Sequence, residues 1–572
     1  MLQMLELLEQ AVEEFEKAEE KNKFIQATDT EWLGFVDKSV TDKEAVNSIL
    51  EENPFLLDYD IIVFGDEIPE GECDFLHLIQ HPQCVIYAIC FRRELLVRAG
   101  SYNCLIKGMV HFEFLLRLAL SGKVYAIPCT ADKQGNLDAN TMAYIMRRYM
   151  RSLKLHGMLD EVFIHFLQSA EVAGVAAEFH VALNCFLENN GEYERIAKDT
   201  APCLILVGSN MYYGVLAGFA NSLADALVGL GQAVITTNGR YGGYDELSTE
   251  ELQMQVYKAV IGFQAPALET DFFQKLKGGR YQFWFDNPIF SADFLGKASK
   301  HTHMLCQDAF YAKFMREYHH IENAIQFPPA GEEMEIHAEE KIYDIVFVGT
   351  YGEEFETAYE DAFQNEFFQY MREHFNSTFE DGLKAIWTKQ GKSYTEQEVV
   401  QQLSELRSVC FDIFNFYRHK VVETILQAGI PLHVFGDSWK KYVGEAADLL
   451  IIHPEVAAEE ALHIWVRSKI GLNIMRGHKA GMTERIANIM LCGACCLSDE
   501  TVYLKEHFRD GEDIVLFRGD ALEELPRRIK CLLHNEEERT RIARAGQEKA
   551  RREHTWRKRA EELLELIDRN GG

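Results

Sequence analysis

From residue 201 onward, short apolar runs alternate with polar loops and helical segments, and this alternation constrains the fold more than any other feature. Leu204–Gly208 is typical of a buried strand, Val215–Leu230 of a helix, and Gln232–Thr237 of the next strand. Parallel strands need a crossover connection, which is usually a helix, so this order predicts a βαβ unit. A second unit begins at Tyr343–Gly349. We therefore expect an α/β chain with two doubly wound parallel-sheet lobes in tandem.

The second series continues with further short apolar runs that end in Gly, Asn or Ser. They are Pro431–Gly436, Lys469–Ile474 and Ala494–Ser498. The acidic, Pro-Pro-containing segment Phe327–Glu340 between the two series is typical of an interdomain connection. We place the first lobe at residues 200–336 and the second at 337–572.

Residues 1–199 form a third block, with helical periodicity and strand-like runs at Tyr59–Phe64 and Cys84–Phe91. A length of 572 residues agrees with several domains. Within the second lobe, Glu373–Leu406 is polar, helical and without a strand, so we expect an excursion between two strands, of no readable function. The charged tail Glu536–Ile567 is typical of solvated helices.

The chain has 58 Lys and Arg against 90 Asp and Glu, a formal net charge of −32. Such a charge repels phosphate backbones and anionic lipids, so neither nucleic acid nor a membrane surface is an expected partner. The segment that starts at Met1 is an acidic amphipathic helix rather than a signal peptide, and no apolar run reaches the length of a membrane span. We expect a cytoplasmic protein.

Thirteen scattered cysteines predict reduced thiols rather than a disulfide framework. Cys492–Cys496 has Cys-x-x-Cys spacing but no second pair at a suitable distance, so packing explains it better than zinc. The pair His319 and His320 lacks a carboxylate framework. No metal site is expected.

A basic, glycine-containing loop precedes a predicted helix in the second lobe. The loop contributes Arg476, His478 and Lys479, and the helix is expected to start near Gly481 and Thr483, with Thr483 as its N-cap. Helix N-termini offer unpaired N–H groups and a partial positive charge, which favour an anion. The alternative is a surface loop without a ligand.

Glu484 and Asn488 are four residues apart and therefore share one face of this helix. Their side-chain oxygens are suited to accept hydrogen bonds from ribose or sugar hydroxyls. For Asn488, a helix-capping or core hydrogen bond is the alternative. Together with the basic loop, these residues suggest a diphosphate-plus-sugar cradle.

Several segments between about residues 200 and 572 resemble the GT-B glycosyltransferases, and in particular the CgeB-like branch of the group 1 (family 4-like) enzymes. The segments are Arg485–Ala494, Leu497–Asp499, Tyr503–Glu512, His554–Arg559, Tyr343–Tyr351, His433–Asp437, Phe283–Pro288 and Gln307–Asp308. The resemblance implies that the second lobe binds a nucleotide-sugar donor and the first lobe an acceptor, without a metal. It makes Gly349 a further donor-binding candidate. Where the family commonly has a ribose-binding Glu, this chain has Asn488, so either Asn488 or Glu484 is expected to take that role.

Loops at the carboxyl ends of strands in the first lobe should face the cleft. They supply Asn210, Tyr212 and Gly214 as acceptor-side candidates. An inverting enzyme needs a general base beside the acceptor hydroxyl, and Asp286 and Asp308 are the candidates for that catalytic carboxylate. For Asp286, which precedes Asn-Pro, a turn-forming role is the alternative.

The amino-terminal block resembles the later half of a GT-A glycosyltransferase. The segments that carry this resemblance are Phe24–Asp37, Tyr59–Glu67, Cys90–Gly100 and His111–Ala119. Such enzymes hold a divalent metal through an Asp-x-Asp-type motif, whereas this chain has Asp37 followed by Lys38 and Ser39. We therefore expect a truncated, degenerate GT-A-like accessory domain over residues 1–199.

The sequence thus predicts a metal-independent glycosyltransferase that uses a nucleotide-diphosphate sugar and a glycan or protein acceptor. One alternative is a protein O-glycosyltransferase that acts on a surface protein such as flagellin. Another is a non-catalytic pseudo-glycosyltransferase scaffold. A homo-oligomer is compatible with the sequence, which leaves the donor, the acceptor and the stereochemical course open.

Overall fold

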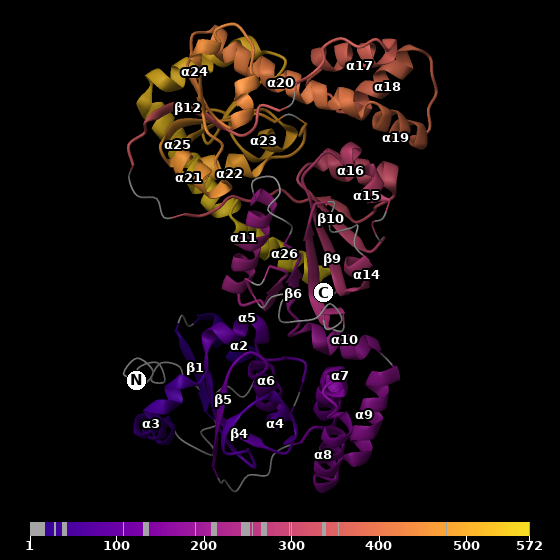
Figure 1. Cartoon of the computed structure of the whole chain (residues 1–572), viewed down its shortest axis with the longest axis vertical. Helices are drawn as coiled ribbons and strands as arrows, with labels where there is room; N and C mark the ends of the chain where they lie inside the picture. Colours follow the sequence, from indigo (N-terminus) through magenta and orange to yellow (C-terminus); the bar gives the residue numbers. More distant parts are fainter. Residues whose placement is uncertain are drawn as a thin grey trace.

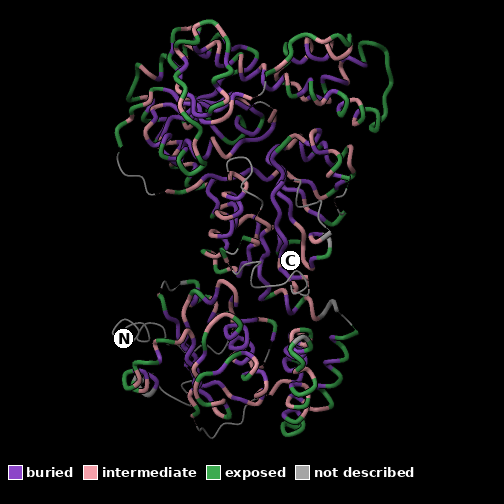
Figure 2. Tube along the Cα trace, viewed as in Figure 1, coloured by how far each residue is buried: buried purple, intermediate pink, exposed green. Residues whose placement is uncertain are grey.

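The structure is a computed structural model in which three tiers follow one another along the long axis (Figure 1). It describes residues 18–27, 30–36, 43–106, 108–129, 137–188, 190–207, 214–238, 240–241, 252–253, 255–264, 271–296, 298, 300–334, 339–352, 354–475 and 477–570. Each tier contains one β-sheet, and buried residues gather along the three sheets (Figure 2).

The middle lobe has a six-stranded sheet in the order β11-β10-β9-β8-β6-β7, and all its strand pairs are parallel. Apolar side chains of α11 and α26 cover one face, and those of α14, α15 and α16 pack against the other. The elements are β6 (Cys203–Ile205), α11 (Val215–Gly229), β7 (Val234–Thr236), β8 (Val256–Phe263), α14 (Asp271–Lys275), β9 (Lys277–Trp284), η4 (Pro288–Ser291), α15 (Ala292–Leu295), β10 (Thr302–Cys306), α16 (Ala309–His319) and β11 (Ala324–Gln326).

The carboxy-terminal lobe also has six parallel strands, in the order β14-β13-β12-β15-β16-β17. Helices α20, α24 and α25 cover one face, and α21, α22 and α23 the other. Outside the helical excursion, the elements are β12 (Tyr343–Val348), β13 (Leu432–Phe435), η5 (Asp437–Lys441), η6 (Ala447–Leu449), β14 (Leu450–His453), α21 (Ala458–Val466), β15 (Ser468–Asn473), α22 (Glu484–Leu491), β16 (Cys495–Asp499), α23 (Val502–His507), β17 (Val515–Phe517), η7 (Leu522–Glu524), α24 (Leu525–His534), α25 (Glu536–Glu553) and α26 (Trp556–Arg569).

These two sheets confirm the predicted α/β architecture with two doubly wound, Rossmann-like lobes. The ends of the observed strands lie within three residues of the predicted runs; for example, the predicted run Tyr343–Gly349 corresponds to β12, Tyr343–Val348. The reason is that parallel strands covered on both faces must be almost wholly apolar, which makes them conspicuous in the sequence. The boundary between 336 and 337 lies outside the described residues, and the boundary at 199/200 stays a prediction.

The excursion from the carboxy-terminal lobe is helical, as expected, and it has its own apolar core. It consists of α17 (Ala362–Glu373), α18 (Phe379–Lys389), α19 (Glu396–Glu405) and the long α20 (Arg407–Gln427), which leads back to the sheet. Ile289 and Phe314 of the middle lobe belong to the same core. The excursion therefore bridges the two lobes, and Figure 1 shows it beside α15 and α16.

The last helix, α26, returns to the middle lobe. Trp556, Leu563 and Ile567 pack with α11 against the middle sheet. At the crossing, the Gly331 N–H donates to the carbonyl of His554 at 2.9 Å. The two lobes are thus joined twice by the chain, once through residues 327–342 and once through the turn between α25 and α26.

The amino-terminal domain has a mixed sheet in the order β1-β4-β2-β5-β3, in which only β2 and β5 are parallel. Its kinship to a GT-A fold stays a prediction, and Asp37 lies outside the described residues. The elements are α2 (Ala18–Ala27), β1 (Trp32–Val36), α3 (Lys43–Glu52), η1 (Pro54–Asp58), β2 (Ile61–Asp66), β3 (Gly71–Cys73), α4 (Phe75–Ile79), β4 (Val85–Arg92), η2 (Arg93–Leu95), α5 (Leu96–Ala99), α6 (Val110–Ala119), β5 (Val124–Pro128), α7 (Ala139–Leu155), α8 (Leu159–Val172), α9 (Ala176–Glu188) and α10 (Asn190–Lys198).

All thirteen cysteines are free thiols, which agrees with the expected reduced state. Cys492, Cys495 and Cys496 are buried, and burial raises the pKa of Cys492 and Cys495 to about 12. Within the described ranges, no helix is both long and apolar enough to cross a bilayer.

Candidate functional site

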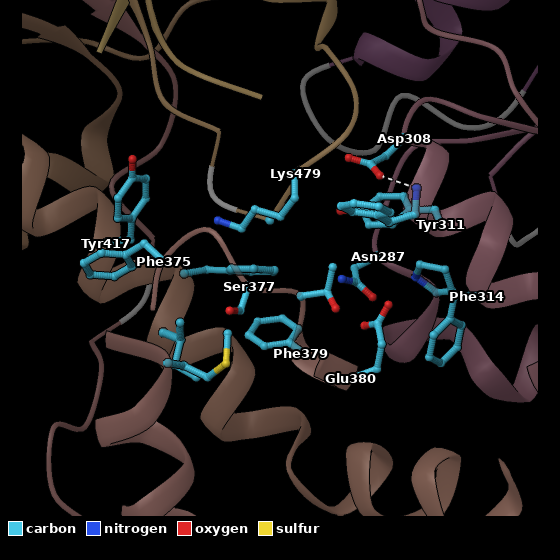
Figure 3. Close-up of a pocket in the computed structure, with 17 residues that line it drawn as sticks. Asn287, Asp308, Tyr311, Phe314, Phe375, Ser377, Phe379, Glu380, Tyr417 and Lys479 are labelled. Carbon is cyan, nitrogen blue, oxygen red and sulfur yellow. Dashed lines mark hydrogen bonds between the residues drawn. The ribbon is translucent and has the colours of Figure 1, made fainter. Parts of the chain in front are cut away.

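A narrow pocket lies where the middle lobe, the helical excursion and the basic loop meet (Figure 3). Tyr311 and Phe314 on α16 line one side, and Phe379 at the start of α18 lines the other. Lys479 and Gly477 from the loop after β15 complete the wall. Because its walls come from both lobes, the pocket exists only when the two lobes are joined.

The carboxyl edge of the carboxy-terminal sheet lies next to this pocket. The strand order reverses between β12 and β15, and ligands of doubly wound sheets bind at this switch point, beyond the carboxyl ends of the strands. Gly349 follows β12 there with a φ of +150°, and its carbonyl accepts a hydrogen bond from the Trp439 indole at 2.7 Å. A Cβ on Gly349 would stand 3.4 Å from the Arg485 guanidinium, so backbone and cation approach closely.

Arg485, in the first turn of α22, is one of two cations beside that switch point. Its guanidinium donates to the Asn473 side-chain oxygen at 2.9 Å and lies 5.3 Å from the Phe347 ring. Arg418 from α20 lies 5.1 Å from the same ring. Burial lowers the pKa of Arg485, but a guanidinium stays charged in proteins. Sequence reasoning missed both arginines as site residues, because no local pattern links α20 to α22.

Thr483 occupies the N-cap position of α22, as predicted, but its hydroxyl donates to Asn473 at 3.2 Å instead of capping the helix. Among the described residues, the side chain at the N-cap position makes no capping hydrogen bond to this helix. Glu484 starts the helix and is half-buried. The N-terminus of α22 therefore keeps its positive end directed at the carboxyl edge of the sheet.

Lys479 is the one predicted cation of the basic loop whose ammonium is placed in the pocket (Figure 3). It lies 5.6 Å from the Tyr417 ring, and among the described residues it forms no ion pair. Burial lowers the pKa of Lys479, while the neighbouring Asp499 and Asp308 raise it. Burial raises the pKa of Asp499 to about 6, and its carboxylate accepts from the Met475 N–H at 2.7 Å and the Tyr417 hydroxyl at 3.0 Å.

Asp308, a predicted catalytic carboxylate, joins the lobes. It caps α16 by accepting from the Phe310 N–H at 2.7 Å, and its other oxygen accepts from the Ala480 N–H at 2.8 Å. The side chain is fully buried, and burial raises its pKa to about 6. With both oxygens held by main-chain donors, Asp308 is better suited to hold the basic loop than to take a proton from an acceptor.

Gly481 lies opposite Asp308 in an antiparallel bridge between the lobes. A Cβ here would stand 2.3 Å from the Gln307 carbonyl oxygen and 2.8 Å from the Asp308 Cα. The sequence suggested Gly481 for anion binding; the structure shows that a glycine is needed for the contact between two backbones. His478 also contacts the middle lobe, with its ring nitrogens 3.1 and 3.2 Å from the Gln307 amide nitrogen.

Asn488 lies on the face of α22 that meets the interlobe connection. Its side-chain oxygen accepts from the Glu332 N–H at 2.8 Å. This hydrogen bond is the structural role that the sequence offered for Asn488 as the alternative to ribose binding. It holds the interlobe connection against α22. The ribose role of Asn488 or Glu484 stays a prediction.

The remaining predicted residues lie on the middle lobe or outside the described ranges. Asp286 follows β9, is exposed and accepts from the Gln264 amide at 2.9 Å. Its neighbour Asn287 lines the pocket instead. Gly214 starts α11 with a φ of +75°. Arg476, Asn210 and Tyr212 lie outside the described residues.

Glu380, at the start of α18, is a pocket carboxyl that sequence reasoning missed. Burial, its largest perturbation, together with the nearby charge of Asp381 raises its pKa to about 7. The nearest site candidate in the sequence, Gly349, lies some thirty residues before it, and the segment around Glu380 has no motif, so no local signal could have identified it. Among the described residues, no group of three or more His, Cys, Asp and Glu side chains is placed to hold a metal ion.

Replacing Glu380 with Gln is expected to change how stability depends on pH. The folded-state pKa of about 7 lies above the unfolded value near 4.5, so the folded protein binds more protons between these values and loses stability as pH rises through them. The variant cannot ionise and lacks this loss. Its free energy of unfolding relative to wild type should rise by at most about 3 kcal/mol from pH 4.5 to pH 8. Parallel stability profiles in urea denaturation would contradict the assignment.

One family model matches the chain. It is described as "Glycosyl transferase-like" and covers residues 418–565, from α20 to α26. No curated protein is a significant match.

Among solved structures, the β-glucosyltransferase of T4 phage with its UDP-glucose substrate has 13% sequence identity and a TM-score of 0.39, with 64% of this chain and 98% of that chain covered. TarM from S. aureus, in a complex that contains UDP, has 10% identity and a TM-score of 0.35, with 56% and 58% covered. Similarities of this size do not establish a shared activity.

The matched residues include α22 and the two cations near its N-terminus, Lys479 and Arg485. The finer assignment to the CgeB-like branch stays a prediction. The match identifies a glycosyl transferase-like domain at residues 418–565 of the carboxy-terminal lobe.

Proposed function

We propose that the chain transfers a sugar from a nucleotide-diphosphate donor to an acceptor, with the diphosphate bound at the carboxyl ends of β12 and β15. The observation that supports this most strongly is a pair of partly buried cations that are not in an ion pair, although the charge of Asp499 acts on both. Lys479 and Arg485 lie at the edge of the doubly wound sheet and form no ion pair among the described residues. Removing a cation from water is costly unless an anion compensates it.

In this proposal, catalysis is electrostatic. As the bond between the anomeric carbon and the diphosphate oxygen breaks, negative charge develops on the leaving group. Lys479, Arg485 and the N-terminus of α22 stabilise that charge in this proposal. Because these groups supply positive charge, we propose that no divalent metal is needed. Asp308 and Gly481 act indirectly, by holding the basic loop against the middle lobe.

Nucleotide binding tests the proposal directly. We expect at least one sugar conjugate of UDP, GDP, CDP or dTDP to raise the melting temperature, because a ligand at about 100 times its Kd adds roughly 2.7 kcal/mol to folded-state stability. The increase should persist in EDTA. No shift with any of the four classes would instead favour the non-catalytic scaffold, and a shift abolished by EDTA would contradict metal independence.

A further inference from the structure

Asp499, the last residue of β16, is a buried carboxyl that the proposed transfer does not use. One of its oxygens accepts from the Met475 N–H at 2.7 Å, and the other accepts from the Tyr417 hydroxyl at 3.0 Å. Neither donor carries a charge, so the carboxylate has no direct ion pair among the described residues. Burying a carboxylate in this way is costly unless a positive charge nearby compensates it.

One such charge is the ammonium of Lys479. Met475 lies at the start of the basic loop that carries this lysine, so its hydrogen bond fixes the loop to Asp499. The ammonium points toward Tyr417 and lies 5.6 Å from the centre of its ring (Figure 3). The same tyrosine donates its hydroxyl to Asp499, so the carboxylate and the ammonium share a neighbour.

The second charge is the guanidinium of Arg485, which a chain of hydrogen bonds connects to the same carboxylate. Arg485 donates to the Asn473 side-chain oxygen at 2.9 Å, and the Asn473 amide donates to the Ser498 hydroxyl at 3.0 Å. That hydroxyl lies 3.4 Å from an oxygen of the Asp499 carboxylate. Asp499 is therefore linked to both cations through uncharged side chains.

The electrostatics agree with this arrangement. Burial lowers the pKa of Lys479 and of Arg485, and the charge of Asp499 counteracts the shift at both. Asp308 adds to this effect at Lys479, and Glu484 adds to it at Arg485. Asp499 is thus the carboxyl whose charge the two cations share.

We infer that Asp499 compensates the charges of Lys479 and Arg485 while the donor site is empty, and that it repels the diphosphate once bound, which makes it a positioning residue for product release. The inference rests on the proposed function, because it needs the diphosphate to lie beside these two cations. When the bond to the anomeric carbon breaks, the diphosphate keeps the electron pair and gains one negative charge. Repulsion by Asp499 is therefore stronger for the nucleotide product than for the nucleotide sugar.

The Asp499→Asn variant removes the charge and keeps the shape of the side chain. Its amide oxygen can accept from the Met475 N–H, and its amide nitrogen can donate to the Tyr417 hydroxyl oxygen. Calorimetric titration at pH 8 with inorganic pyrophosphate should show binding about tenfold tighter than in wild type. UDP, GDP, CDP and dTDP should be compared with their glucose conjugates, and the gain should be larger for the free nucleotide. A purely structural role predicts weaker binding instead.

The gain should disappear at low pH. Burial raises the pKa of Asp499 to about 6, so at pH 5 the wild-type carboxyl is largely neutral and resembles asparagine. The ratio of the two pyrophosphate affinities should fall from about tenfold at pH 8 to less than about twofold at pH 5. Other titratable groups around the site are the same in both proteins and cancel in this ratio; they are Lys479, Arg485, Glu484, Asp308, Tyr417, His478, Glu500 and Asp520.

Asp344→Asn is the matched control for net charge. This aspartate is exposed, lies at the amino end of β12 and pairs with Lys469 at 2.6 Å, so it belongs to the opposite edge of the same sheet. Its replacement removes the same charge and should change no affinity by more than about twofold, because exposed charges at this distance are screened by salt.

Tyr417→Phe is a second variant that leaves the carboxyl in place. The tyrosine hydroxyl favours the ionised form of Asp499 through its hydrogen bond. Without it the carboxyl stays neutral to higher pH, so pyrophosphate should bind more tightly than in wild type at pH 7 and equally at pH 5. This variant keeps the test valid if Asp499→Asn fails to fold.

Two results overturn the inference. One is binding of pyrophosphate to Asp499→Asn at pH 8 that is no tighter than in wild type. The other is a gain of the same size at pH 5 and pH 8. The panel also separates the two proposals. If nucleotides bind wild type and Asp499→Asn brings no gain, the proposed transfer stands and this inference falls. If pyrophosphate shows the expected gain and no nucleotide or nucleotide sugar binds, the counter-charge stands and the proposed transfer falls.

Discussion

The Lys479→Met variant is expected to transfer sugar about 10²–10³-fold more slowly than wild type while remaining folded. The ammonium lies in the pocket, 5.6 Å from the Tyr417 ring and without an ion pair among the described residues. Removing one preorganised charge that stabilises a transition state typically costs this factor. Methionine retains the apolar stem, and the lysine ammonium is in no ion pair with a described residue, so we expect the variant to stay folded.

The rate is measured as nucleotide released from the donor that the binding screen identifies. Lys505→Met is the matched control: its ammonium is half-exposed and lies 3.4 Å from Glu500 on the surface of the same lobe. That variant should keep wild-type activity. A Lys479→Met enzyme with an unchanged rate and an unchanged Kd for the nucleotide would remove Lys479 from the diphosphate site.

The Gly481→Ala variant is expected to lose both stability and activity. The added Cβ would stand 2.3 Å from the Gln307 carbonyl oxygen and 2.8 Å from the Asp308 Cα, and both are backbone atoms of the opposite lobe. Backbone atoms cannot move aside cheaply, so the lobes must separate at this bridge. Overpacking of this kind costs about 1–3 kcal/mol. The shift would also displace Lys479, two residues away, so transfer should fall by more than tenfold.

Urea unfolding and nucleotide titration of the purified variant measure the two effects. Gly296→Ala is the control, because a Cβ there meets nothing within 4 Å and its φ of −62° suits alanine. If Gly481→Ala matched this control in both measurements, the backbone bridge would be unimportant for the site.

The sheets of the two lobes could be predicted from the sequence because each strand is specified by its own residues. The apolar run of Ser468–Asn473 and the loop and helix that follow it identify the edge of the sheet without knowledge of the rest. The positions of Lys479 and the start of α22 follow from the same local pattern.

The function of individual site residues could not be predicted in the same way. Asp308 looks like a free carboxylate after a strand, and only the structure shows that the Ala480 N–H, 172 residues away, occupies one of its oxygens. Asn488 looks like a sugar-binding amide, yet its side-chain oxygen accepts a hydrogen bond from the Glu332 N–H. A contact between lobes cannot be predicted from a single sequence, because the residues around one contacting side chain do not indicate which distant residue it meets.

The pocket between the lobes could not be predicted from the sequence for a related reason. Phe379 and Glu380 lie in a polar helical segment whose sequence is ordinary for a surface helix. They line a pocket only because Tyr311 and Phe314 of the middle lobe lie opposite them. A segment can therefore be recognised as helical from its own residues while its role depends wholly on where it docks.

The path of α26 has a consequence for how the protein is made. The middle sheet is complete at β11, but part of its apolar cover comes from Trp556, Leu563 and Ile567. Roughly 240 residues of chain separate the two, which at about 5–20 residues per second means a delay on the order of 10–50 s during translation. Until α26 emerges from the ribosome, one face of the middle sheet stays partly uncovered. The nascent chain in that interval is expected to be a substrate for chaperones, and ribosome-bound chains that end near residue 540 should be more sensitive to protease in the middle lobe than the finished protein.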